Sequence, residues 1–179
     1  MPMFDAQIKI TGKHALILQK YCKDKGTDQD VDFVLSNNCG EDKKCYVFDT
    51  RIMCYMVAAM LGIDSKRSVE VDSDKGINAV ANIFVEVLGR NKDNLDRIYH
   101  HMILSENASL SPDVKIKKAF SIVPEENSAQ EQHRLENYVR GGLEIIDGLF
   151  APCKTYEDFC NAIIDFYASL GIISDKPSE

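Results

Sequence analysis

An uninterrupted apolar segment in the first third of the chain constrains the fold most. Over residues 52–61, apolar side chains fall on nearly every face of a helix, so a helix here is buried on all sides. Asp49 is the predicted N-cap, Phe48 and Met53 have the spacing of a hydrophobic staple, and Gly62 is the predicted stop. The sequence therefore predicts a central helix from Asp49 to Gly62, against which the rest of the chain packs.

Six further segments carry the period or the end signals of a helix. The clearest is an i, i+3, i+4, i+7, i+8 stripe of Leu95, Ile98, Tyr99, Met102 and Ile103. The other five are expected near residues 13–23, 77–88, 112–120, 128–150 and 155–170, the last two opened by capping boxes. Alternation over residues 7–10 indicates one short N-terminal strand. We therefore predict an all-α bundle of about seven helices.

The length of 179 residues suits a single domain over 1–179. The polar residues 64–76 form the best candidate for an internal boundary, and 172–179 are expected to be a flexible tail. The first residues lack the basic and apolar regions of a secretory signal, and the apolar run 52–63 is too short to span a bilayer. We therefore expect a cytoplasmic protein with no membrane contact, whose thiols are mostly reduced.

Charge is distributed unevenly along the chain. Residues 1–67 carry 10 basic and 9 acidic side chains, residues 68–120 carry 7 and 8, and residues 121–179 carry 4 and 11. The formal net charge of −7 therefore belongs to the last third. That balance argues against nucleic-acid binding over the whole surface but leaves a local basic patch open. The acidic helices of residues 128–179 suit either a solvated face or a basic protein partner.

The cysteine and acid clusters give only weak signs of a metal or catalytic site. Cys39 and Cys45 are separated by five residues, a gap outside the usual zinc spacing, so free thiols are the expected alternative. Residues 72–76 resemble the opening of a calcium loop but lack its later ligands, and residues 70–75 resemble a nuclease cluster but lack the flanking strand pattern. Cys54 and Cys160 are expected to be buried and unreactive inside helices. We expect no catalytic residue, no metal and no cofactor.

Two adjacent glycines, Gly141 and Gly142, interrupt the predicted helix 128–150. Each costs about 1 kcal/mol relative to alanine in a helix interior. Close packing against another backbone explains them, and so does a kink that displays Arg140 to a partner.

Residues 47–62 (VFDTRIMCYMVAAMLG) resemble a segment of small proteins encoded beside bacterial DNA phosphorothioation (Dnd) systems. In that family an aromatic and a few polar residues lead into an apolar helix that ends Ala-Ala-x-x-Gly. The opening residues 8–13 (IKITGK) are similar to the start of such proteins. The resemblance carries no catalytic residue and implies an accessory, DNA-associated or complex-forming protein of a bacterial or phage defence locus.

The leading hypothesis is a non-enzymatic protein that contacts DNA, or a DNA-bound partner, through its N-terminal third. Lys13 and Lys20 are seven residues apart and share a helix face, which suits sequence-independent phosphate contact as well as ordinary solvation. The candidate phosphate contacts are Lys9, Lys13, Lys20, Lys23, Lys43 and Lys44. The alternative is a protein-binding module or homo-oligomer that uses the acidic C-terminal helices.

Overall fold

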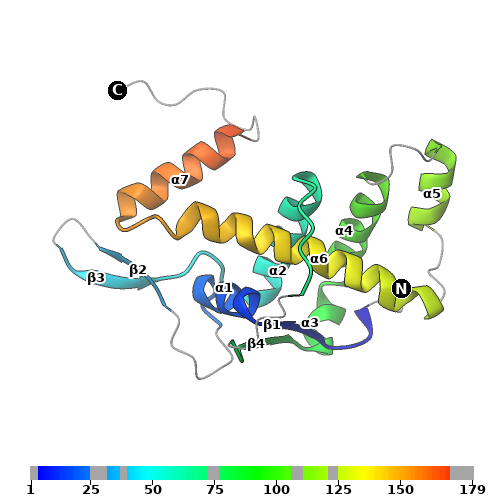
Figure 1. Ribbon diagram of the computed structural model, residues 1–179, viewed down its shortest axis with the longest axis horizontal. Coiled ribbons are helices and arrows are strands. Elements are labelled where there is room, and N and C mark those ends of the chain that lie inside the picture. The colour runs from blue at the N-terminus through cyan, green and yellow to red at the C-terminus, as the bar shows by residue number, and fades with distance from the viewer. Residues whose placement is uncertain are drawn as a thin grey trace.

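The computed structural model describes residues 4–24, 32–36, 40–71, 77–105, 111–120 and 125–169. Over these residues the chain forms seven helices and two small antiparallel sheets of two strands each (Figure 1). The prediction of an all-α bundle is therefore wrong, and the fold is α+β. The elements are β1 (Ile8–Thr11), α1 (Lys13–Tyr21), β2 (Phe33–Ser36), β3 (Asp42–Cys45), α2 (Arg51–Asp64), β4 (Val80–Ile83), α3 (Val85–Arg90), α4 (Lys92–Ser105), α5 (Pro112–Phe120), α6 (Glu125–Phe150) and α7 (Tyr156–Ser169).

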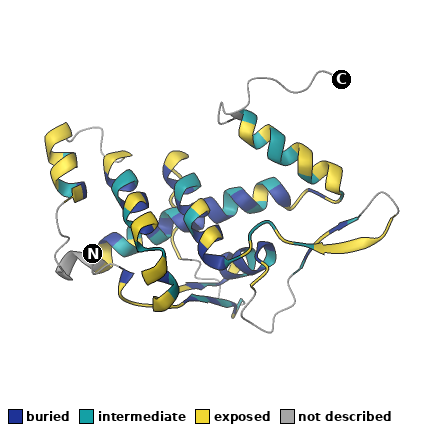
Figure 2. Cartoon of the chain, turned by 180° about the vertical axis from the view of Figure 1, so that it is seen from behind, coloured by how far each residue is buried: buried dark blue, intermediate teal, exposed yellow. Residues whose placement is uncertain are grey.

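The long helix α6 crosses the molecule and packs on the apolar helix α2, while α1 lies against both helices and α4 lies against α2 (Figure 1). Figure 2 shows α6 mostly buried through its middle, whereas α5 and the outer face of α7 are exposed. The predicted stripes account for this arrangement, since Leu135, Val139 and Ile146 of α6 are buried. The prediction that α2 is central is confirmed, but burial on all sides is wrong, because Met53 and Val57 are exposed.

Three glycines allow the backbone of α6 to contact the backbone of α2 and of the segment that follows α2. A Cβ on Gly142 would lie 1.8 Å from the Ala58 carbonyl oxygen, and one on Gly62 would lie 2.0 Å from the Tyr138 oxygen. A Cβ on Gly141 would meet the Arg67 carbonyl oxygen at 1.8 Å. Helix α6 continues through its two glycines, so close packing is confirmed and the kink is wrong.

Both predicted ends of the central helix need correction. Thr50, not Asp49, is the N-cap, because its hydroxyl accepts a hydrogen bond from the Met53 N–H. Gly62 does not stop the helix, which runs on to Asp64. This glycine makes room for the backbone of α6 instead.

The first sheet joins the start of the chain to a segment predicted as helix. β1 pairs antiparallel with β4, with Ile8 opposite Ile83 and Thr11 opposite Val80. The predicted strand near residues 7–10 is confirmed. The predicted helix over residues 77–88 is wrong, because its first half pairs with β1 as a strand and helix begins only at Val85.

The second sheet is a hairpin of β2 and β3 that projects from the body, with Phe33 opposite Cys45 and Ser36 opposite Asp42 (Figure 1). Phe33 packs against Tyr21 and Phe159, which ties the hairpin to α1 and α7. β3 is mostly exposed and shows no alternation of apolar and polar residues, so no sequence signal indicated it.

The remaining helices largely follow their sequence signals. The predicted stripe of α4 is buried throughout, and the capping box of α7 forms, since Asp158 accepts from the Thr155 N–H at 2.9 Å. Cys54 is buried as predicted, and burial raises the pKa of its thiol. Cys160 is exposed, so the prediction of its burial is wrong. Cys39, residues 72–76 and the predicted tail 172–179 lie outside the described residues.

Candidate functional site

Two of the six predicted phosphate-binding lysines pair with acidic residues of α6. Lys13 Nζ lies 2.9 Å from Glu144 Oε1, and Lys20 Nζ lies 3.1 Å from Asp147 Oδ1. The Tyr21 hydroxyl also donates to Asp147 Oδ1 at 2.7 Å. The lysine face of α1 and part of the acidic last third therefore neutralise each other inside one molecule.

The other four candidate lysines do not converge with this pair. Lys9 is exposed on β1, and Lys23 is exposed just after α1. Lys43 and Lys44 lie on the projecting hairpin, where Lys44 pairs with Asp32. The structure therefore spreads the predicted phosphate contacts over several separate segments.

Glu144 is the centre of a charge cluster between α1, α6 and the segment after α2. Arg67 donates to its Oε2 at 2.6 Å, while Lys13 and His14 reach its Oε1. Burial by itself would raise the pKa of Glu144, but the hydrogen bonds from Lys13 and Arg67 outweigh it and lower that pKa to about 2. Burial lowers the pKa of His14, against the opposing effect of Glu144.

We expect Glu144→Gln to lower the free energy of unfolding by about 2 kcal/mol at pH 7, measured by urea titration. A carboxylate whose pKa falls from 4.5 to about 2 on folding contributes stability that is complete above pH 4.5. That contribution declines as the pH falls toward 2. The difference between wild type and variant must therefore shrink in acid. Glu86→Gln, an exposed control on α3, should change stability by less than about 0.5 kcal/mol, and an E144Q penalty that grew in acid would refute the assignment.

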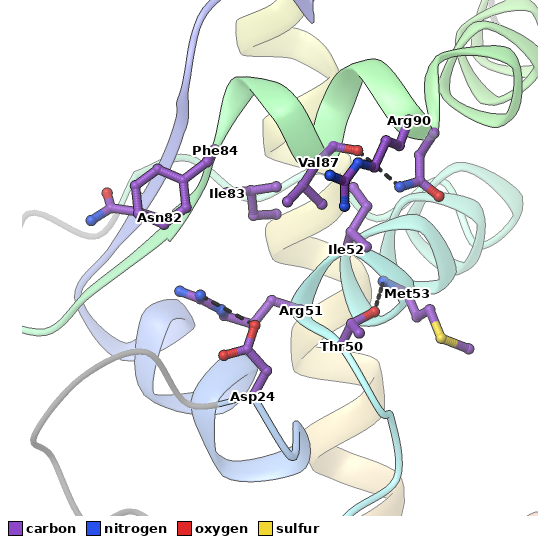
Figure 3. A pocket seen from close by; sticks show the side chains of 11 residues that line it. Asp24, Thr50, Arg51, Ile52, Met53, Asn82, Ile83, Phe84, Val87 and Arg90 are labelled. Carbon is purple, nitrogen blue, oxygen red and sulfur yellow. Dashed lines mark hydrogen bonds and ion pairs between the residues drawn. The ribbon is translucent and has the colours of Figure 1, made fainter.

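A pocket opens where the start of α2 meets the junction of β4 and α3. Its volume is about 380 Å³, within the range of small-molecule sites. Ile52, Ile83 and Val87 form apolar walls, and Arg51 and Arg90 approach from opposite sides (Figure 3). We call it the Arg51 pocket; its lining is Asp24, Thr50, Arg51, Ile52, Met53, Asn82, Ile83, Phe84, Val87, Arg90 and Asn91.

Arg51 is an unusual residue for its position. It is only 9% exposed, and its Nε has no hydrogen-bond partner among the described residues. It is also the first residue of α2, where the positive end of the helix dipole disfavours a cation. Its one ion pair in the described part of the chain joins its terminal nitrogen to Asp24 Oδ2 at 3.3 Å (Figure 3).

The backbone adds further donors at the same place. The Thr50 hydroxyl accepts from the Met53 N–H, which leaves the N–H groups of Arg51 and Ile52 without an intrahelical acceptor. The first turn of α2 contains no acidic residue. Arg90, at the end of α3, has no ion pair within the described ranges. Guanidinium groups and helix N–H groups together form a setting for an anion, opposed by Asp24, the only carboxylate among the lining residues that the structure describes.

A second hollow of about 470 Å³ lies between α2, α4 and α7. Met56, Val57, Met60 and Phe166 give it an apolar lining, with Asp64 and Arg97 also present. Asp64 accepts from His101 at 2.7 Å. None of the residues described around this hollow offers a buried donor without a partner. The Arg51 pocket is therefore the better candidate site.

Comparison with known proteins assigns no family. No protein-family model, no curated protein and no solved structure matches the chain. The resemblance of residues 47–62 to Dnd-associated proteins stays a prediction. The site is therefore judged from its own geometry.

Sequence reasoning missed the Arg51 pocket, although one signal for it was present. Arg51 is a charged residue directly before the apolar run 52–61 of a helix predicted to be buried. Burial of an unpaired charge costs free energy, so an arginine at this position is unexpected. Asn82 and Phe84 could not be assigned, because their segment was predicted as helix. In the described part of the chain, no group of three or more His, Cys, Asp or Glu side chains could hold a metal ion. No helix there is long and apolar enough to cross a membrane.

Proposed function

We propose that the chain is a non-enzymatic binding protein that holds the anionic group of a ligand in the Arg51 pocket. The observation that carries this proposal is the buried guanidinium of Arg51, whose Nε lacks a partner among the described residues. A buried donor without an acceptor costs about 1–3 kcal/mol. An anion bound between Arg51, Arg90 and the first turn of α2 offsets that cost.

The lining of the pocket supports binding rather than catalysis. Its described residues include no histidine, cysteine, lysine or serine. Among them the only carboxylate, on Asp24, lies beside Arg51, and the only hydroxyl, on Thr50, caps α2. General acid-base or nucleophilic catalysis requires a group paired for proton transfer, and this set contains none.

We expect Arg51→Met to weaken binding of inorganic phosphate by about 10–100-fold, because it removes the buried guanidinium and leaves only Arg90 as a charged donor in the described lining. Asp24→Asn should tighten it a few-fold, because the variant removes the competing carboxylate. Binding is measured by NMR titration or calorimetry on the full chain.

The matched control is Arg97→Met, which removes the same side chain from an exposed position on α4 and should leave phosphate binding unchanged. Thermal unfolding should show that Arg51→Met is as stable as wild type or more so, because the orphaned Nε is lost. Equal phosphate binding by wild type and the Arg51→Met variant would overturn the proposal.

DNA contact through the N-terminal lysines is a second proposal. It is supported by Lys9, Lys23 and Lys43, which are exposed and have no ion pair among the described residues. Partner binding through the acidic C-terminal helices is supported by the open apolar hollow beside α7. Titration with duplex DNA separates the pocket from the lysines as the site of DNA contact. Loss of duplex binding in Arg51→Met would assign DNA binding to the pocket, and retained binding would assign it to the lysines.

A further inference from the structure

We infer that the ligand of the Arg51 pocket is a phosphate monoester that carries a planar ring, of the kind found in a nucleoside monophosphate. This inference rests on the proposed function, because it assumes that the anion lies at the start of α2. It adds a planar ring to the anionic group already proposed.

Phe84 supplies the first reason for a ring. It links β4 to α3, lines the pocket, and is 49% exposed. Figure 3 shows its ring on the same side of the hollow as the guanidinium of Arg51. An exposed phenyl ring beside a pocket is a platform on which a planar group can stack, and such stacking is sequence-tolerant because every base has a π-face.

The rest of the lining fits the same ligand. Ile52, Ile83 and Val87 cover the space between the two arginines with apolar side chains, so a ligand that is an anion alone would leave them in water. Asn82 comes from the strand that leads into Phe84 and lines the pocket beside it. The pocket thus has a charged part and a larger apolar part.

The anionic end fits phosphate better than carboxylate. Arg51 and Arg90 come from different elements, and the first N–H groups of α2 form a third set of donors. A phosphate monoester has three terminal oxygens to accept from donors on separate elements, whereas a carboxylate has two oxygens.

The test compares four probes by calorimetry on the full chain: inorganic phosphate, ribose 5-phosphate, adenosine and adenosine 5′-monophosphate. We expect the monophosphate to bind about tenfold tighter than ribose 5-phosphate, and adenosine to bind more weakly than either. Phe84→Ala should remove the tenfold gain and leave ribose 5-phosphate binding unchanged. Arg51→Met should weaken binding of both phosphate compounds.

Phe120→Ala is the matched control, since Phe120 is exposed on α5 and stacks on His100, away from the pocket. It should leave all four affinities unchanged. A 5′-phosphorylated oligonucleotide, as a fifth probe, distinguishes a free nucleotide from the end of a strand, both of which contain the inferred group.

The outcomes separate the two proposals. Equal affinity for ribose 5-phosphate and adenosine 5′-monophosphate would refute recognition of the ring, and so would unchanged affinities in Phe84→Ala. Either result would leave the proposed anion site standing. No binding of phosphate, ribose 5-phosphate or the monophosphate would overturn both. Adenosine binding as tightly as the monophosphate would overturn the anion site and with it this inference.

Discussion

Gly142→Ala should lower the free energy of unfolding by about 3 kcal/mol or more, measured by urea or thermal denaturation. The added methyl group would lie 1.8 Å from the carbonyl oxygen of Ala58, a backbone atom that cannot rotate away. The helices α2 and α6 would have to separate, and their interface is the most extensive helix contact in the described chain. Overpacking that moves backbone costs more than the strain of one side chain.

Gly148→Ala is the matched control on the same helix. Nothing lies within 4 Å of a Cβ at this position, which is exposed. The substitution should therefore raise stability by about 0.5–1 kcal/mol, as expected for alanine in a helix. If both variants changed stability in the same direction by a similar amount, the close approach at Gly142 would be refuted.

The second large effect is expected at Arg140, which is 4% exposed on α6. Burial lowers its pKa, against the opposing effect of Glu136 and Glu70. Its guanidinium donates to Asn137 Oδ1 at 2.6 Å and lies 3.5 Å from Glu136 Oε2. Arg140→Met should lower the free energy of unfolding by about 2–4 kcal/mol, because it leaves these acceptors buried without a donor.

A double-mutant cycle tests the cause. Adding Glu136→Gln to Arg140→Met should recover part of the loss, with a coupling energy of about 1 kcal/mol. Arg97→Met, which removes an exposed arginine, should stay within about 0.5 kcal/mol of wild type. Additive losses in the cycle would show that Arg140 acts through packing alone.

Arg51 and Arg140 should therefore respond in opposite ways to the same substitution. The ion-pair partner of Arg51, Asp24, is about half exposed and returns to water when the guanidinium is removed. The partners of Arg140 are largely buried on its own helix and cannot do so. A buried arginine whose removal does not lower stability is what we expect of a residue that serves binding.

The helices could be predicted from sequence because their signals are local. Apolar stripes and the capping box at Thr155 each depend on residues within a few positions of one another. The strand β4 could not be predicted in this way. Val80–Ile83 is apolar enough for a helix or a strand, and its pairing with β1 decides the outcome.

Gly62 shows the same limit at a single residue. A glycine at the end of an apolar helix predicts a stop, yet here it admits the backbone at Tyr138. The ion pairing of Lys20 could not be predicted for a related reason. Lys20 and Asp147 were assigned to separate surfaces because nothing in the sequence indicates that α1 lies beside α6.

The crossing of α2 and α6 also governs how the chain is made. Thr11 pairs with Val80, and Ala58 lies against Gly142, so both contacts join residues far apart in sequence. Closing such long loops slows folding. While the ribosome is still synthesising the chain, α2 lacks the main partner for its apolar surface until the glycines of α6 have emerged. The apolar surface of the nascent α2 therefore stays uncovered until α6 is available, because the two helices share the Ala58–Gly142 contact.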